Sequence, residues 1–119
     1  FGLPVPEIQV TDALDKAHTE YEGKPTAARA KLAFFHLGQV DVELIEPIDG
    51  PSTWKDQLDE HGDSIHHVAF QIDGMQETVA YLESKDISLI QRGEYTGGRY
   101  AYVNAVEQLG CVLELLEND

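Results

Sequence analysis

Apolar and polar residues alternate along several short stretches of the chain, and a period of two residues predicts β-strands. The clearest pair of stretches covers residues 31–37 and 40–46. These stretches flank Gly38-Gln39, which predicts a turn, so we expect an antiparallel hairpin. Further strands are predicted at residues 5–10, 64–73, 87–91, 99–103 and 112–116.

Two segments carry a helical pattern instead. Residues 53–61 follow Ser52, a suitable N-cap, and precede Gly62, a residue type that commonly ends helices. Residues 74–85 place apolar side chains three and four positions apart, so these side chains form one stripe that can pack on a sheet. The stripe consists of Met75, Val79 and Leu82.

The predicted strand at residues 64–73 has two different faces. One face is apolar and is expected to pack in a core. The other face presents an imidazole, a small residue and an amide, which suits the lining of a cavity. A His that faces a cavity can bind a divalent metal ion, so His67 is a candidate ligand. The apolar face comprises Val68, Phe70 and Ile72, and the other face comprises His67, Ala69 and Gln71.

The hairpin has a counterpart near the end of the chain. Residues 32–46 resemble residues 100–117, with a loop three residues longer in the second copy, and self-similarity of this kind indicates a duplication. Each copy carries one glutamate at the same place on its return strand, Glu43 in the first and Glu114 in the second. Glu43 has apolar neighbours on both sides, and burial of an unpaired carboxylate is costly. It is therefore a candidate functional residue, the alternative being a place on a solvated sheet face.

The repeat also predicts what the first copy contains. His67 lies 47 residues before Glu114. The same spacing counted back from Glu43, corrected for the loop, falls before residue 1. We therefore expect the first copy to lack its opening strand and helix.

Composition limits the possible functions. The 119 residues are 42% hydrophobic, enough for one domain with a core. The single cysteine, Cys111, excludes an internal disulfide and fits a reducing cytoplasm, and no export leader or membrane-spanning apolar run is evident. The net charge of −14 argues against nucleic acid and against an anionic membrane surface as partners.

Three blocks of the sequence resemble a known family. Residues 62–73, with His67-Val68-Ala69 among them, look like the start of the second module in the vicinal oxygen chelate superfamily. That superfamily includes glyoxalase I, methylmalonyl-CoA epimerase, extradiol dioxygenases and bleomycin-resistance proteins. Residues 42–52 and 109–117 resemble the epimerase branch most, and the resemblance covers roughly residues 31–117.

The resemblance implies an α+β fold in which paired βαβββ modules with curled mixed sheets form a cup. It implies one domain over residues 1–119, divided into three parts. These parts are a partial first module at 1–50, a linker helix at 51–63 and a second module at 64–119.

The resemblance also implies a metal site. His67, Glu114 and Glu43 would hold a divalent ion such as Co, Ni, Zn or Mn, and Glu114 or Glu43 would act as the catalytic base. The first ligand of the family, a His or Gln on the opening strand, has no equivalent in this chain. His66 is expected to point to the opposite face of its strand, so no role is carried over to it.

The implied function is that of a metal-dependent epimerase or isomerase, which moves a proton next to a carbonyl or thioester in a substrate such as an acyl-CoA. One alternative is glyoxalase I, a lactoylglutathione lyase that acts on a glutathione adduct. Another is a metal-free binding protein of the bleomycin-resistance type. An iron dioxygenase ranks last because that branch usually needs two His and one carboxylate. We expect a homodimer, as is common in this superfamily.

Overall fold

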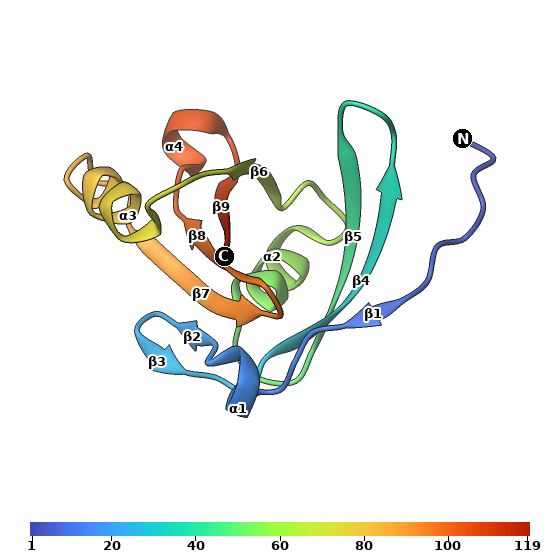
Figure 1. The fold of residues 1–119 in the computed structure, drawn as a ribbon, viewed down its shortest axis with the longest axis horizontal. Coiled ribbons are helices and arrows are strands. Elements are labelled where there is room, and N and C mark those ends of the chain that lie inside the picture. The colour runs from blue at the N-terminus through green and yellow to red at the C-terminus, as the bar shows by residue number, and fades with distance from the viewer.

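A computed structural model describes residues 1–119 and shows a mixed α+β fold with two sheets (Figure 1). The three-stranded sheet has the order β1 (Gln9–Val10), β4 (Arg29–His36), β5 (Asp41–Ile48). The six-stranded sheet has the order β3 (Lys24–Pro25), β2 (Glu20–Tyr21), β7 (Leu89–Tyr95), β8 (Gly98–Val103), β9 (Val112–Asn118), β6 (His67–Gln71). The helices are α1 (Leu14–Ala17), α2 (Thr53–His61), α3 (Met75–Glu83) and α4 (Val106–Leu109).

The second half of the chain follows the order β6, α3, β7, β8, β9, which confirms the expected βαβββ arrangement there. Strand β6 runs parallel to β9, whereas β7–β8 and β8–β9 are antiparallel pairs. A parallel pair needs a long crossover connection, and α3 with β7 and β8 supplies it. Strand β6 therefore lies at the edge of the large sheet, next to the strand that carries Glu114.

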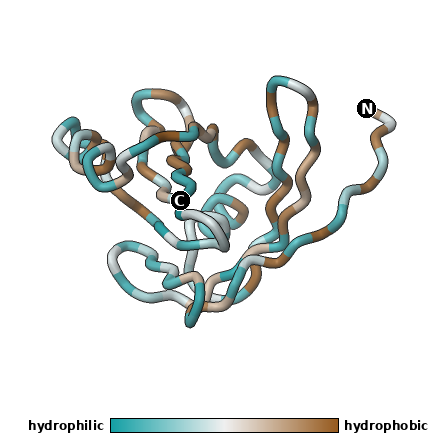
Figure 2. Tube along the Cα trace, viewed as in Figure 1, coloured by the Kyte–Doolittle hydropathy of each residue, from teal (hydrophilic) through white to brown (hydrophobic).

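The two copies of the repeat have the same cross-strand register. Phe34 lies opposite Glu43 in the β4–β5 pair, and Tyr102 lies opposite Glu114 in the β8–β9 pair. The predicted hairpin at residues 31–46 is confirmed, and Figure 2 shows hydrophobic and hydrophilic residues alternating along it. Strand β5 has a partner only on its β4 side, whereas β9 has β8 on one side and β6 on the other.

Two apolar clusters hold the fold together. One lies where α2 sits between the sheets (Figure 1), and it is centred on Trp54 and Tyr102 with Ala28, Ala30 and Val112. Helix α2 begins after Ser52, whose side chain accepts a hydrogen bond from the Lys55 amide at 3.0 Å, as an N-cap does. The other cluster lies under α3 and contains Ala101, Val103, Leu115 and the apolar stripe of α3.

One expectation about β6 is wrong. Val68 and Phe70 were expected in the core, but they are 48% and 57% exposed. Only Ile72, the third residue of that face, packs in the cluster under α3. β6 is an edge strand, and neither Val68 nor Phe70 packs in the cluster under α3.

Other differences concern short elements. The strand expected at residues 5–10 is paired only at Gln9–Val10, and Glu22-Gly23 form a turn between the paired strands β2 and β3. Helix α4 lies in the longer loop of the second copy, before Cys111. None of the helices combines the length and the apolar character needed to cross a lipid bilayer.

Candidate metal centre

Three side chains singled out in the sequence converge at one point. The Nε2 atom of His67 lies 3.2 Å from Oε2 of Glu43 and 3.1 Å from Oε2 of Glu114. One possible ligand atom from each residue lies within 4.8 Å of the other two. The three residues come from three strands and both sheets, so only the folded chain brings them together.

The strand register explains the convergence. In the parallel β6–β9 pair His67 lies opposite Val112 and Ala69 lies opposite Glu114. His67 and Ala69 point the same way because they are two residues apart in a strand, so the imidazole and the Glu114 carboxylate share one face of the large sheet. Glu43 reaches the same point from the other sheet.

The site is largely shielded from water. The side chains of Glu43, His67 and Glu114 are 17%, 10% and 9% exposed. Burial on its own lowers the pKa of His67, but hydrogen bonds and charge interactions with Glu114 and Glu43 outweigh it and raise that pKa to about 9. A protonated His67 balances one of the two carboxylate charges.

The donor set fits a divalent cation. One imidazole nitrogen and two carboxylate oxygens suit Zn, Co, Ni or Mn. A divalent ion that replaced the proton on Nε2 of His67 would balance both carboxylates, whereas that proton balances only one. The residues present therefore fit the group that the family resemblance implies.

The site opens into the larger of two notable cavities. This cavity has a volume of about 1120 Å³ and is bounded by β5, β6, α2 and the segment before β6. Its wall includes the three converging residues together with apolar side chains such as Ile45 and Leu58. Apolar walls with a few convergent polar groups are typical of small-molecule sites.

Two aromatic residues, Tyr102 and Trp54, pack beside the site. The ring of Tyr102 lies 5.2 Å from the His67 ring, and its hydroxyl accepts a hydrogen bond from Nε1 of Trp54 at 3.0 Å. Burial raises the pKa of Tyr102 well above its usual value, so this phenol stays neutral.

His66 is a correction to the sequence analysis. It was expected to point away from the site, but its Nδ1 lies 3.0 Å from Nδ1 of His67, and its ring packs against Tyr102. His66 precedes the first residue of β6, so the strict alternation of a strand does not apply to it. Burial, followed by the neighbouring His67, lowers the pKa of His66 to about 4. The tandem His66-His67 was the only sequence signal for this contact.

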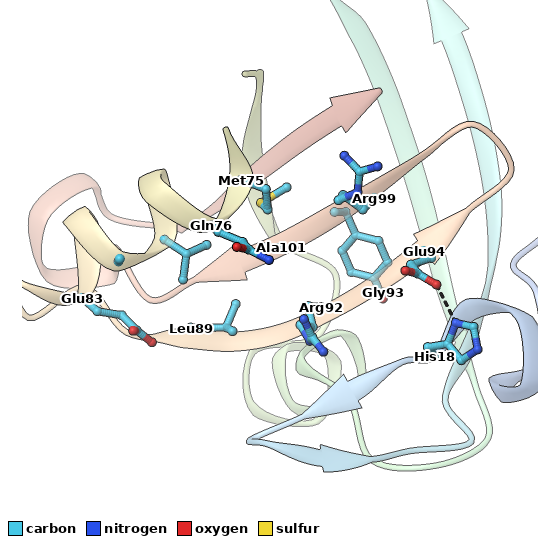
Figure 3. A pocket seen from close by; sticks show the side chains of 13 residues that line it. His18, Met75, Gln76, Glu83, Leu89, Arg92, Gly93, Glu94, Arg99 and Ala101 are labelled. Atoms are coloured by element: carbon cyan, nitrogen blue, oxygen red, sulfur yellow. Dashed lines mark hydrogen bonds and ion pairs between the residues drawn. The ribbon is translucent and has the colours of Figure 1, made fainter. Parts of the chain in front are cut away.

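The second cavity lies on the opposite side of the large sheet, between α3 and strands β7 and β8 (Figure 3). It has a volume of about 280 Å³ and an apolar floor that includes Leu89 and Ala101. Its basic side chains are already paired, since Arg92 binds Glu20, Arg99 binds Glu117 and the His18 ring contacts Glu94. His18 is an exposed surface residue, and the converging carboxylates and imidazole lie only in the larger cavity.

Comparison with known proteins identifies relatives in both sequence and structure. The chain is 32% identical over 92 residues to the uncharacterized protein YqjC of Bacillus subtilis, and the match covers 75% of this chain and 66% of that protein. The chain therefore spans about two thirds of the length of this relative.

Two solved structures share the fold. The hypothetical protein BH1468 from Bacillus halodurans superposes with a TM-score of 0.59 at 22% identity, over 76% of this chain and 67% of that one. A methylmalonyl-CoA epimerase in complex with methylmalonyl-CoA and NH4+ superposes with a TM-score of 0.54 at 16% identity, over 96% of this chain and 93% of that one. Residues 6–103 match the glyoxalase/bleomycin resistance protein/dioxygenase superfamily, and the chain belongs to that superfamily.

Proposed function

We propose that this chain binds a divalent metal ion through His67, Glu43 and Glu114 and catalyses proton transfer next to a carbonyl or thioester. The observation that carries the proposal is the convergence of these three side chains on the wall of the large cavity. Members of the superfamily usually bind a divalent metal ion. A bound ion would polarise the substrate oxygen and stabilise the negative charge that develops when the proton leaves.

The protein would supply the base. Both Glu43 and Glu114 are candidates from the sequence, but Glu43 is the more exposed of the two, at 17% against 9%. Glu43 also comes from the sheet opposite His67 and Glu114, so it can shift without moving them. We assign retention of the ion to His67 and Glu114. Glu43 would be the third ligand until substrate takes its place on the ion, and it would then remove and return the proton.

The proposed substrate class is an acyl-CoA thioester. The fold neighbour was solved with methylmalonyl-CoA, and the cavity of about 1120 Å³ has room for a substrate of that kind. Electrostatic repulsion opposes the binding of CoA, because the chain carries a net charge of −14 and CoA carries several phosphate charges. The glyoxalase I reaction, with a hemithioacetal of glutathione, uses the same site and remains the alternative enzyme activity.

A metal-free binding protein is a second candidate because the site is already partly balanced without an ion. His67 contacts both carboxylates, and no buried side-chain polar atom of the chain lacks a partner. In this case the cavity would hold a small molecule and the three residues would be structural.

Metal analysis and proton exchange distinguish these functions. Purified protein is loaded with Co²⁺, Zn²⁺ or Mn²⁺ and incubated in deuterated water with methylmalonyl-CoA or, separately, with the glutathione hemithioacetal. Deuterium in the recovered acyl-CoA supports the epimerase, and deuterium in the lactoylglutathione product supports the lyase. Absence of a stoichiometric metal ion and of exchange in both arms overturns the enzyme in favour of the binding protein.

Matched variants test the assignment of the base. Glu43→Gln should lower the exchange rate about 100-fold or more, because it removes general-base catalysis. Glu46→Gln is the control, since Glu46 lies on the same strand with its side chain 69% exposed and should leave the rate unchanged. Equal exchange rates in the two variants would exclude Glu43 as the base.

A further inference from the structure

A chain of hydrogen bonds leads away from the proposed metal site. Nδ1 of His67 lies 3.0 Å from Nδ1 of His66, and Nε2 of His66 lies 3.2 Å from Oγ1 of Thr53. Thr53 is the first residue of α2, and its own amide donates to Oε1 of Gln91 at 2.9 Å. These hydrogen bonds therefore connect the start of β6 to the N-terminus of α2 and to β7.

The protonation of the ring nitrogens determines which atom donates and which accepts in each of these hydrogen bonds. A metal ion on Nε2 of His67 requires the lone pair of that atom, so the ring proton of a neutral His67 must be on Nδ1. The only side-chain partner of that Nδ1 is Nδ1 of His66, which must then accept. A neutral His66 that accepts at Nδ1 carries its proton on Nε2, where the Thr53 hydroxyl can accept it.

We propose that His66 is a positioning residue that accepts the Nδ1 proton of His67 and thereby presents Nε2 of His67 to the metal ion. The inference rests on the proposed function, because it assigns His66 a role toward the metal. Ligand histidines usually donate their second ring N–H to a carboxylate, a backbone carbonyl or water, and this contact sets both the tautomer and the ring orientation. Here a second imidazole takes the place of that acceptor.

The surroundings hold His66 in place for this role. Its ring packs edge-on against Tyr102, with 5.1 Å between ring centroids, and Tyr102 is 2% exposed. Thr53 is 7% exposed and Gln91 is 1% exposed, so the residues at the other end of this series of hydrogen bonds are buried as well. No carboxylate is bonded to His66, which leaves it free to act as an acceptor toward His67.

The test compares three variants with the wild type by calorimetric titration with Zn²⁺ and Co²⁺. His66→Phe keeps a ring but removes the acceptor, and it should weaken metal binding about 10- to 100-fold, as loss of such a contact typically does. His66→Asn places an amide oxygen near the position of Nδ1 and should restore affinity close to the wild-type value. His61→Phe is the control, because His61 is exposed at the end of α2 and should not change the affinity.

A spectroscopic readout separates positioning from a general effect on the fold. In the zinc-loaded wild type, ¹⁵N NMR should show a protonated Nδ1 on His67, and on His66 an unprotonated Nδ1 with a protonated Nε2. If His66→Phe does not fold by circular dichroism, His66→Asn and Thr53→Val carry the test, with Thr53→Val expected to show a smaller loss of affinity.

Two results would overturn the role of His66 alone. They are metal affinity unchanged in a folded His66→Phe, and a protonated Nδ1 on His66 in the zinc-loaded protein. A wild-type chain that binds none of the tested ions would overturn the proposed function, and the role of His66 with it. The two failures are therefore distinguishable.

Discussion

The β4–β5 and β8–β9 hairpins are two copies of one design in different surroundings. Each places a glutamate opposite an aromatic residue, Glu43 with Phe34 and Glu114 with Tyr102. Each also pairs a cation and a glutamate across the strands, Lys31–Glu46 in the first and Arg99–Glu117 in the second.

The surroundings differ in what covers each copy. In the second copy α3 packs on the outer face and Leu115 is 3% exposed. The corresponding residue of the first copy, Leu44, is 56% exposed. Strand register alone therefore places a glutamate in the site, whereas flanking elements decide how firmly it is held. This difference supports Glu114 as the fixed ligand and Glu43 as the adjustable base.

The largest expected effect concerns the apolar residue that follows each glutamate. Leu115→Ala should lower the free energy of unfolding by about 2–5 kcal/mol, because it leaves a cavity in the cluster under α3. Leu44→Ala should change it by no more than about 0.5 kcal/mol, because Leu44 is largely solvated. Urea denaturation measures both, and equal losses would show that the two copies are equally covered.

Metal binding should reduce the difference in local stability between the β4–β5 hairpin and the β8–β9 hairpin. At a free ion concentration 100 times Kd, the proposed ion should stabilise the protein by about 2.7 kcal/mol. Because the ion would connect the two sheets, amides of β5 should gain more hydrogen-exchange protection than amides of β9. A chelator should reverse both effects, and protection confined to β9 would argue against Glu43 as a ligand.

The aromatic residues opposite the glutamates should also differ. Tyr102→Phe leaves the buried indole N–H of Trp54 without its acceptor and should cost about 1–3 kcal/mol. Phe34→Tyr is the matched reverse change, and it should stay within about 0.5 kcal/mol because Phe34 lies beside the large cavity. Thermal unfolding at fixed pH measures the pair, and the comparison fails if Phe34→Tyr costs as much as Tyr102→Phe.

The smallest effects are expected at the repeated ion pairs. Glu117 also accepts hydrogen bonds from the amides of Gly74 and Met75 at the start of α3, whereas Glu46 binds only Lys31. Glu117→Gln should therefore lower the melting temperature more than Glu46→Gln.

The difference in melting temperature between Glu117→Gln and Glu46→Gln should shrink as the pH falls. The hydrogen bond from Arg99 and those from the two amides lower the pKa of Glu117 below its usual 4.5. The stability that this carboxylate contributes is therefore complete above pH 4.5, and it is lost as the pH falls through the lowered value. If the melting temperatures of Glu117→Gln and Glu46→Gln differ as much at acidic pH as at neutral pH, this explanation is wrong.

Local sequence patterns predicted the elements whose signals lie within a few residues. Helix α2 begins and ends at the predicted residues because Ser52 caps it and Gly62 follows it. The repeat correctly related Glu43 to Glu114, since both positions follow from alternation and spacing. The position of His67 beside both glutamates was predictable because alternation assigns the faces of β6 from that residue onward.

Features that depend on distant partners could not be predicted in this way. The pairing of β2 with β7 joins Glu20 to Arg92, and no local signal indicates it. The exposure of Phe70 depends on the place of β6 at the edge of the large sheet, which is set by its pairing with β9. The contact of His66 with His67 depends on where β6 begins, and boundaries of elements are the least certain part of a sequence pattern.

Strands β5 and β6 each end a sheet, so each presents backbone groups that no neighbouring strand in the chain satisfies. Such edges favour intermolecular strand pairing, and Val68 and Phe70 add apolar surface beside one of them. The net charge of −14 opposes this association through mutual repulsion between molecules. Added salt shortens the range of that repulsion, so the colloidal behaviour of this chain is set by ionic strength as much as by its fold.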